Sequence, residues 1–405
     1  MSLAQRSDYT FKYNVNLIRH GWLRLTPAYS VKLVRELLVD KPKSTLVLDP
    51  FSGTATTPVV AAELGMTARS FDVNDFLVWF GNVKCHQYQT RSIDYIRNTL
   101  DQIVQTFYAH QQNKKWLPAM HNIERWWSPK TLDFLSSLRE SILRKTDIPG
   151  RSIAGDILWI AFCRLIIETS SAAFNHVSMS FKDQTISHER EQIIEIYELI
   201  VRSMLSSLNV KLAGDARVSR GDSCEPLKSD IDQFDCVVTS PPYPNRISYI
   251  RELRPYMYWT SFLTNAKEAG ELDWQSVGGT WGIATSRLTE WTSTNGWAPA
   301  KLMSICSKID HNDNKNGHLM STYVFKYFHD MHRHLKNLRS VLKRGAILHY
   351  IVGNSTFYGI GVPTDELLMM SMESLGYSNL SSLVVRKRNS KKELFEYCVS
   401  AEYSA

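Results

Sequence analysis

The turn Asp49-Pro-Phe-Ser-Gly-Thr54 has the residue types of a ligand-binding turn, and it follows an apolar, β-branched run at residues 44–49. An acid at the carboxyl end of a buried parallel strand, followed by a turn and a helix, builds a pocket at the edge of a sheet. Gly53 allows a ligand to approach the backbone closely, and the helix offers its first N–H groups. No P-loop lysine follows and GxGxxG is absent, so the turn favours an amine-bearing or cationic ligand over a phosphate. An ordinary strand-to-helix turn is the alternative.

A second acid, Asp72, ends the second expected strand at residues 68–72. In a nucleotide-binding βαβ unit an acid at this position accepts hydrogen bonds from ribose hydroxyls. Asp75 is an alternative for this role, or a solvated side chain. Together, the first turn and Asp72 predict a ligand that contains an adenosine.

A third motif, Ser240-Pro-Pro-Tyr243, follows the β-branched run at residues 234–239. Because two consecutive prolines supply no N–H, the carbonyl of Pro241 is a rigid acceptor, and the Ser240 hydroxyl offers another beside it. Tyr243 adds an aromatic face. Two acceptors and a stacking plane suit the exocyclic amine of a flat heterocycle. The alternative is a proline-rich turn that ends a strand.

The elements that must position these motifs alternate between strand and helix. Apolar spacing predicts helices at residues 31–38, 58–65, 322–343 and 363–375. Further strands are expected at 216–218 and 346–352, and a closing hairpin at 380–385 and 394–400. Residues 80–210 carry helical patterns with few glycines, whereas 260–320 are rich in Gly, Ser, Thr and Asn and indicate an irregular, loop-rich region.

Composition bounds the class of protein. The 405 residues allow two or three domains, or one domain with large insertions, and 43% hydrophobic residues exclude a mainly disordered or fibrous chain. The charge of +7 permits a nucleic-acid partner without requiring one. Six cysteines without a CxxC pair indicate free thiols in a reducing cytosol and no metal site. The apolar stretch 153–168 is too short and too charged to span a membrane, so we expect a buried helix and a cytoplasmic protein.

The two motifs DPFSGT (49–54) and SPPY (240–243) together resemble the S-adenosylmethionine-dependent amino-methyltransferases of DNA, which modify cytosine N4 or adenine N6. SPPY is most similar to the cytosine-N4 form, since the adenine-N6 enzymes more often carry Asp or Asn in place of Ser240. Weaker similarities extend the resemblance from about residue 20 to 400, at residues 20–30, 221–223, 342–354 and 362–366.

The resemblance implies an α/β fold: a Rossmann-like class I methyltransferase domain with a twisted, mostly parallel seven-stranded sheet, a C-terminal β-hairpin and a mostly helical insertion. Residues 1–84 would form its first, cofactor-binding part. Residues 85–210 would form the insertion, a candidate for target recognition. Residues 211–405 would form the catalytic part, with a loop-rich insertion at about 260–320. That second insertion is also large enough to read bases, so the sequence assigns recognition to neither region.

The resemblance also implies roles for individual residues. The cofactor-binding set is Asp49, Pro50, Phe51, Gly53, Thr54, Asp72 and Asp222, and the catalytic set is Ser240, Pro241, Pro242 and Tyr243. The chain has Ala55 where the family usually has glycine, which predicts a slightly altered turn. Nucleic-acid contacts are expected at Asn245, Arg246, Arg386 and Arg388, with salt bridges or a solvated hairpin as the alternative.

The expected reaction is methyl transfer from S-adenosylmethionine to N4 of a flipped cytosine in double-stranded DNA, by direct attack of the amine. The resemblance further implies a restriction–modification system with a cognate restriction endonuclease. Three alternatives remain: the adenine-N6 reaction, amino-methylation of RNA, and a non-catalytic DNA-binding protein on the same fold. The recognition sequence and the oligomeric state are not encoded in these motifs.

Overall fold

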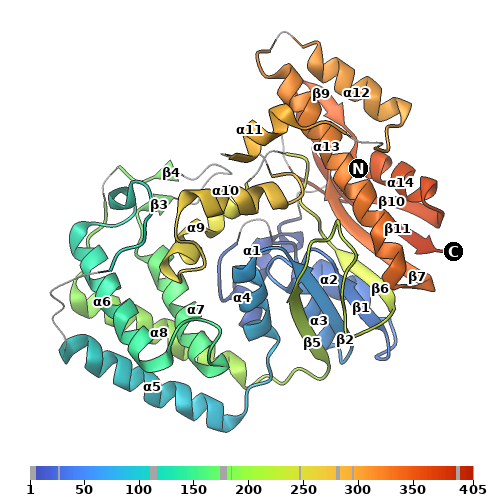
Figure 1. Cartoon of the computed structure of the whole chain (residues 1–405). Coiled ribbons are helices and arrows are strands. Elements are labelled where there is room, and N and C mark those ends of the chain that lie inside the picture. Colours follow the sequence, from blue (N-terminus) through green and yellow to red (C-terminus); the bar gives the residue numbers. More distant parts are fainter. Residues whose placement is uncertain are drawn as a thin grey trace.

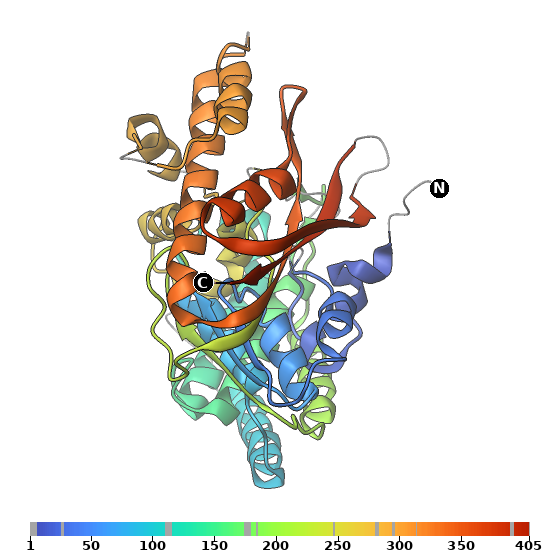
Figure 2. The same ribbon diagram turned by 90° about the vertical axis from the view of Figure 1, so that its right-hand side faces the viewer.

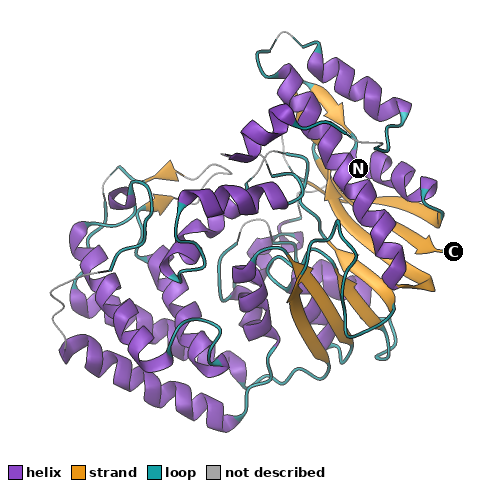
Figure 3. Cartoon of the chain, viewed as in Figure 1, coloured by secondary structure: helices purple, strands orange, loops and turns teal. Residues whose placement is uncertain are grey.

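The computed structural model describes residues 6–25, 28–109, 116–173, 180–183, 185–245, 248–279, 283–293, 296–312, 314–388 and 393–404. The chain folds into a sheet covered by helices, a helical unit beside it, and an arm above it (Figures 1 and 3). The helices are α1 (Phe11–Asn14), α2 (Val31–Leu38), α3 (Thr56–Glu63), α4 (Asp75–Cys85), α5 (Thr90–Ala109), α6 (Pro129–Thr146), α7 (Ile153–Glu168), α8 (Arg190–Leu208), α9 (Tyr249–Trp259), α10 (Ala266–Gln275), α11 (Ile283–Glu290), α12 (Ala300–Asp310), α13 (Gly317–Leu338) and α14 (Thr364–Ser374). The strands are β1 (Leu46–Asp49), β2 (Thr67–Asp72), β3 (Ala172–Ala173), β4 (Ser180–Phe181), β5 (Asp215–Arg220), β6 (Phe234–Thr239), β7 (Leu342–Gly353), β8 (Ser355–Phe357), β9 (Ile360–Val362), β10 (Tyr377–Lys387) and β11 (Phe395–Tyr403).

The main sheet has seven strands in the order β10-β11-β7-β6-β1-β2-β5. Neighbouring strands from β7 to β5 pair in parallel, and β11 pairs antiparallel with both β7 and β10. Figure 2 shows the C-terminal hairpin β10–β11 in red. The predicted fold class, a mostly parallel seven-stranded α/β sheet closed by a C-terminal hairpin, is confirmed.

The central strand β1 shows why these residues form a two-faced sheet. Val47 and Leu48 are both fully buried, and their side chains point to opposite faces because side chains alternate along a strand. Val47 packs with apolar residues of α2 and α3, whereas Leu48 packs with those of α13 and α14. Helices on both faces explain the uninterrupted apolar run that predicted this strand.

The helical unit α5–α8 carries the short hairpin β3–β4 and is built around α7, where every residue from Ile157 to Cys163 is completely buried. Its core continues into α4 and α9, where the rings of Phe76 and Tyr256 stack at 5.8 Å. The chain enters and leaves the unit at one place, because the Gln87 side-chain amide donates to the carbonyl of Leu212 (2.7 Å).

The expectation of an irregular region at residues 260–320 is wrong for much of that segment. It contains α10, α11, α12 and the start of α13. In α12, Leu302, Ile305 and Ile309 are buried against α13, at a spacing that stabilises a helix despite the polar residues around it. With α11, the start of α13 and β8–β9, this helix forms an arm that projects beyond the sheet (Figures 1 and 2).

All six cysteines are free, as predicted, and the structure places all six in buried positions. Across the described ranges, no helix combines the length and apolar character needed to cross a bilayer.

Candidate active site

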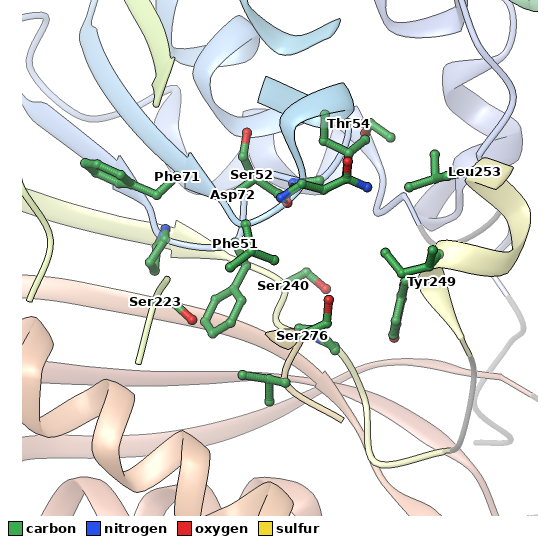
Figure 4. A pocket seen from close by; sticks show the side chains of 18 of the residues that line it. Phe51, Ser52, Thr54, Phe71, Asp72, Ser223, Ser240, Tyr249, Leu253 and Ser276 are labelled. Carbon is green, nitrogen blue, oxygen red and sulfur yellow. Dashed lines mark hydrogen bonds between the residues drawn. The ribbon is translucent and has the colours of Figure 1, made fainter. Parts of the chain in front are cut away.

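Four loops meet at the carboxyl edge of the sheet, after β1, β2, β5 and β6, and together with α9 they surround one cavity (Figure 4). The loops after β1 and β6, about 190 positions apart in the sequence, adjoin because these two strands pair directly. The cavity is lined by Leu25, Ala28, Tyr29, Pro50, Phe51, Ser52, Gly53, Thr54, Phe71, Asp72, Val73, Asn74, Leu77, Gly221, Asp222, Ser223, Ser240, Pro242, Tyr249, Ile250, Leu253, Gln275, Ser276 and Val277.

Asp49 does not line this cavity but lies beneath it, fully buried. Its carboxylate accepts hydrogen bonds from the Thr239 hydroxyl (2.6 Å) and the Phe51 N–H (3.1 Å), so it joins the turn after β1 to the end of β6. Burial raises the pKa of Asp49 to about 6, although these hydrogen bonds act in the opposite direction. Asp49 therefore shapes the two turns from below.

The backbone of the turn after β1 has a left-handed conformation at two residues, which are separated by one position. Gly53 has φ 49° and Ala55 has φ 58°, both in the left-handed region. Ala55 thus adopts the conformation that favours glycine, with its side chain buried among apolar residues. The Lys84 ammonium, itself buried, donates to the carbonyl of Thr54 from below.

Asp72 and Asp222 line the cavity on the side of β2 and β5. The Asp72 carboxylate accepts hydrogen bonds from the N–H groups of Gly53 and Asn74 (both 2.9 Å). Burial nevertheless raises its pKa to about 7. The Asp222 carboxylate accepts from the Cys224 N–H (2.8 Å). Two carboxylates beside an apolar space can accept hydrogen bonds from hydroxyl or amine groups of a ligand.

Ser240 and Pro242 line the cavity below α9, whereas Pro241 is buried behind them. The nearer acceptor for the Ser240 hydroxyl is the carbonyl of Ile351 at 3.1 Å. Donation of its proton in that direction leaves the lone pairs of Ser240 as acceptors for a ligand. The Pro242 carbonyl, in contrast, accepts from the Tyr327 hydroxyl (2.8 Å).

Tyr243 lies behind the cavity rather than on its lining. Its hydroxyl donates to the buried carboxylate of Glu396 (2.8 Å), and its N–H donates to the Tyr249 hydroxyl (2.9 Å). Its ring packs so closely on Gly353 that a Cβ atom there would lie 2.8 Å from it.

The arginines expected to contact nucleic acid are engaged within the C-terminal hairpin. Arg386 pairs with Glu396 through Nε (2.7 Å) and a second nitrogen (3.2 Å). Arg388 donates to the carbonyls of Phe395 and Asn354. The salt-bridge alternative therefore describes Arg386, and main-chain carbonyls hold Arg388. Asn245 is half-buried, and Arg246 lies outside the described residues.

Several lining residues were not predicted from the sequence, among them Tyr249 and Leu253 of α9 and Ser276 after α10. Tyr249 stands only six positions after Tyr243, and an aromatic residue so close to the SPPY motif is a usable signal. His334 was also missed. It lies beneath the cavity, where its Nδ1–H donates to the Ser223 carbonyl (2.8 Å) and its Nε2 accepts from the Tyr350 hydroxyl (2.6 Å), and its ring meets Phe51 edge-on at 4.8 Å.

Within the described residues, no group of three or more His, Cys, Asp and Glu side chains is arranged to hold a metal ion. The lining does contain a hydroxyl suited to an organic ligand. The Ser52 side chain is buried and its oxygen has no hydrogen-bond partner among the described residues. A buried polar atom of this kind is expected to bind a ligand or water.

The chain is similar to type II methyltransferases over nearly all its length. It is 22% identical to M.AvaI of Nostoc sp. and of Anabaena variabilis over 422 aligned positions, which cover 96% of this chain and 86% of the relative. It is 22% identical to M.MvaI of Kocuria varians over 353 positions, covering 81% of this chain and 74% of the relative. A scan against protein-family models gives no match.

One solved structure that aligns with the chain is the rRNA methyltransferase aviRa from Streptomyces viridochromogenes. The alignment covers 93% of this chain and 86% of that chain at 9% identity, with a TM-score of 0.28. A score this low supports no statement about fold or function.

Proposed function

We propose that the chain is an S-adenosylmethionine-dependent DNA methyltransferase that methylates the N4 amine of cytosine. The observation that carries this proposal is the arrangement around one cavity. The turn 49–54 and two carboxylates lie on one side, and Ser240 presents acceptor lone pairs on the other. The similarity to type II methyltransferases over 96% of the chain supports methyl transfer, and the choice of the N4 amine of cytosine rests on Ser240.

The lining fits the implied cofactor. Asp72 is placed to accept from ribose hydroxyls, and Asp222 from the adenine amine, with Phe51 as an apolar wall. The unpartnered hydroxyl of Ser52 offers a further polar contact. When bound, S-adenosylmethionine supplies a methyl group activated by the neighbouring sulfonium.

The second task of the site is to bind the exocyclic amine that receives the methyl group. The lone pair of an exocyclic amine is delocalised into the ring, which makes it a weak nucleophile. Ser240, on the lining, would accept a hydrogen of this amine, favour a tetrahedral nitrogen and stabilise the positive charge that develops on it. The resemblance implies the carbonyl of Pro241, which lies behind the lining, as the second acceptor. A cavity below the protein surface requires the base to leave the duplex. Ser240 rather than an acid favours cytosine over adenine.

By the same argument we propose a restriction–modification role, with a cognate endonuclease that recognises the same site. The relatives' name, type II methyltransferase, supports this role.

The test uses the purified full chain, tritiated S-adenosylmethionine and duplex DNA of mixed sequence, digested to nucleosides after the reaction. Label in N4-methylcytosine is the expected result. Label in N6-methyladenine would overturn the base assignment and retain the cavity. Transfer to RNA alone, or to no nucleic acid while the cofactor binds, would refute DNA methylation. Ser240→Ala is the matched variant, expected to lower kcat about 10–100-fold and keep the cofactor.

A further inference from the structure

We propose that Glu396, on the C-terminal hairpin, is a positioning residue that fixes Tyr243 of the SPPY motif through its hydroxyl. This inference rests on the proposed function for its effect on turnover, but its structural content is a contact that can be tested without activity.

The contact joins two segments that are far apart in the sequence. Tyr243 follows β6, whereas Glu396 lies in β11, two strands away in the sheet. The hydroxyl of Tyr243 donates to Oε1 of Glu396 at 2.8 Å, and Glu396 is only 4% exposed. A hydrogen bond to a buried carboxylate is strong and directional, so it restricts the rotation of the phenol ring.

Glu396 is itself held in place from the neighbouring strand. Arg386 stands directly opposite in the antiparallel register and donates through two nitrogens to the carboxylate. This pairing fixes the orientation of the Glu396 carboxylate, whose Oε1 is directed at Tyr243. A basic residue that the sequence suggested for a phosphate thus takes part in holding the tyrosine.

The ring of Tyr243 is confined on its other sides as well. Gly353 provides the flat backbone surface against it, and the Arg388 guanidinium lies 5.4 Å from the ring centroid. The Ser240 oxygen is 3.5 Å from the Tyr243 hydroxyl. The position of the tyrosine therefore also bears on the position of the serine that faces the cavity.

The test compares Glu396→Ala, Glu396→Gln and Tyr243→Phe with the double variant Tyr243→Phe/Glu396→Ala. Glu396→Ala should lower kcat about 10–100-fold, because a small misplacement of a substrate-holding group costs on the order of a hundredfold. The dissociation constant of the cofactor should not change. Glu396→Gln keeps an acceptor for the phenol and should restore kcat to within about threefold of the wild type. The double variant should be no slower than Tyr243→Phe alone.

The matched control is Glu402→Ala, which removes a glutamate of the same strand that pairs with Asn379 on the outer part of the hairpin (2.6 Å). It should leave kcat unchanged. Equal losses in Glu402→Ala and Glu396→Ala, or effects of Tyr243→Phe and Glu396→Ala that multiply in the double variant, would overturn the proposal.

A second readout does not depend on methyl transfer. In protein labelled with 3-fluorotyrosine, the fluorine resonance of Tyr243 is assigned by its loss in Tyr243→Phe. It should shift in Glu396→Gln and remain in place in Glu402→Ala. An unchanged resonance would refute the contact. If the wild type transfers no methyl group while the resonance shifts, the proposed function fails and the positioning contact stands.

Discussion

Replacing Asp72 by Asn should make the protein more stable without cofactor and weaken its binding of the cofactor. The carboxylate is half-buried beside the cavity, and its pKa is raised from 3.8 to about 7. Between about pH 4 and 7, Asp72 is therefore protonated in the folded chain and ionised in the unfolded chain. The free energy of unfolding therefore decreases as the pH rises from the pKa of the unfolded state through the pKa of the folded state. At pH 8 the ionised carboxylate destabilises the fold.

The size of the effect follows from that shift. About three pKa units correspond to at most about 4 kcal/mol at pH 8. Asp72 accepts hydrogen bonds from the N–H groups of both Gly53 and Asn74, whereas Asn offers a single oxygen acceptor. The hydrogen bond lost in the variant reduces the gain in stability by about 1–3 kcal/mol. The net gain in the free energy of unfolding is then about 1–3 kcal/mol, or roughly 1–3 °C in Tm for a chain of this length.

The assay is thermal unfolding of both proteins at pH 5 and pH 8, with and without S-adenosylmethionine. Asp72→Asn should show a higher Tm at pH 8 and little or no gain at pH 5, where Asp72 is protonated. Asp49 is present in both proteins, so the difference isolates Asp72. Loss of a charged acceptor should weaken the cofactor about 10–100-fold. An equal or lower Tm of the variant at pH 8, with unchanged pH dependence, would refute the assigned burial energy.

Four further substitutions test the site. Tyr243→Ala should abolish methyl transfer and leave cofactor binding intact, as measured by turnover and calorimetry; unchanged turnover would remove the tyrosine from the mechanism. Ser240→Ala should lower kcat about 10–100-fold through loss of an acceptor for the amine, and equal activity would show that the serine does not touch the substrate. Ala55→Gly should change the free energy of unfolding by no more than about 1 kcal/mol, since relief of the left-handed backbone offsets the lost methyl contacts. Ala55→Val should destabilise the fold by about 2 kcal/mol or more, and a stable valine variant would contradict the observed backbone conformation.

The sequence predicted the sheet well because its central strands are buried on both faces. The runs at 44–49 and 234–239 have apolar centres at 46–48 and 236–238, and each leads into a turn whose residues indicate a ligand. The sequence could not show which way the last side chain of a strand points. Asp49 was expected at the cofactor and instead bonds to Thr239 beneath the cavity.

The basic residues of the hairpin illustrate a second limit. The cluster at 386–392 is compatible with a phosphate contact as long as its surroundings are unknown. Once β10 and β11 pair, the register places Glu396 opposite Arg386, and the two side chains form a salt bridge. Likewise, nothing in the spacing of Tyr249 or Ser276 predicts that α9 and the segment after α10 fold over the edge of the sheet.

The hydrogen bond between Gln87 and Leu212 joins the chain just after α4 to the chain just before β5. The path of the chain through the sheet is therefore the same as if a short loop connected these two elements. The helical unit can therefore change in length and surface without disturbing the strand order, as a domain inserted into a loop does. The shared core sets a limit to this freedom, because α4 and α9 pack on the unit and α9 also provides Tyr249 and Leu253 to the cavity. A shift of the unit against the sheet would be transmitted through α9 to the wall of the cavity.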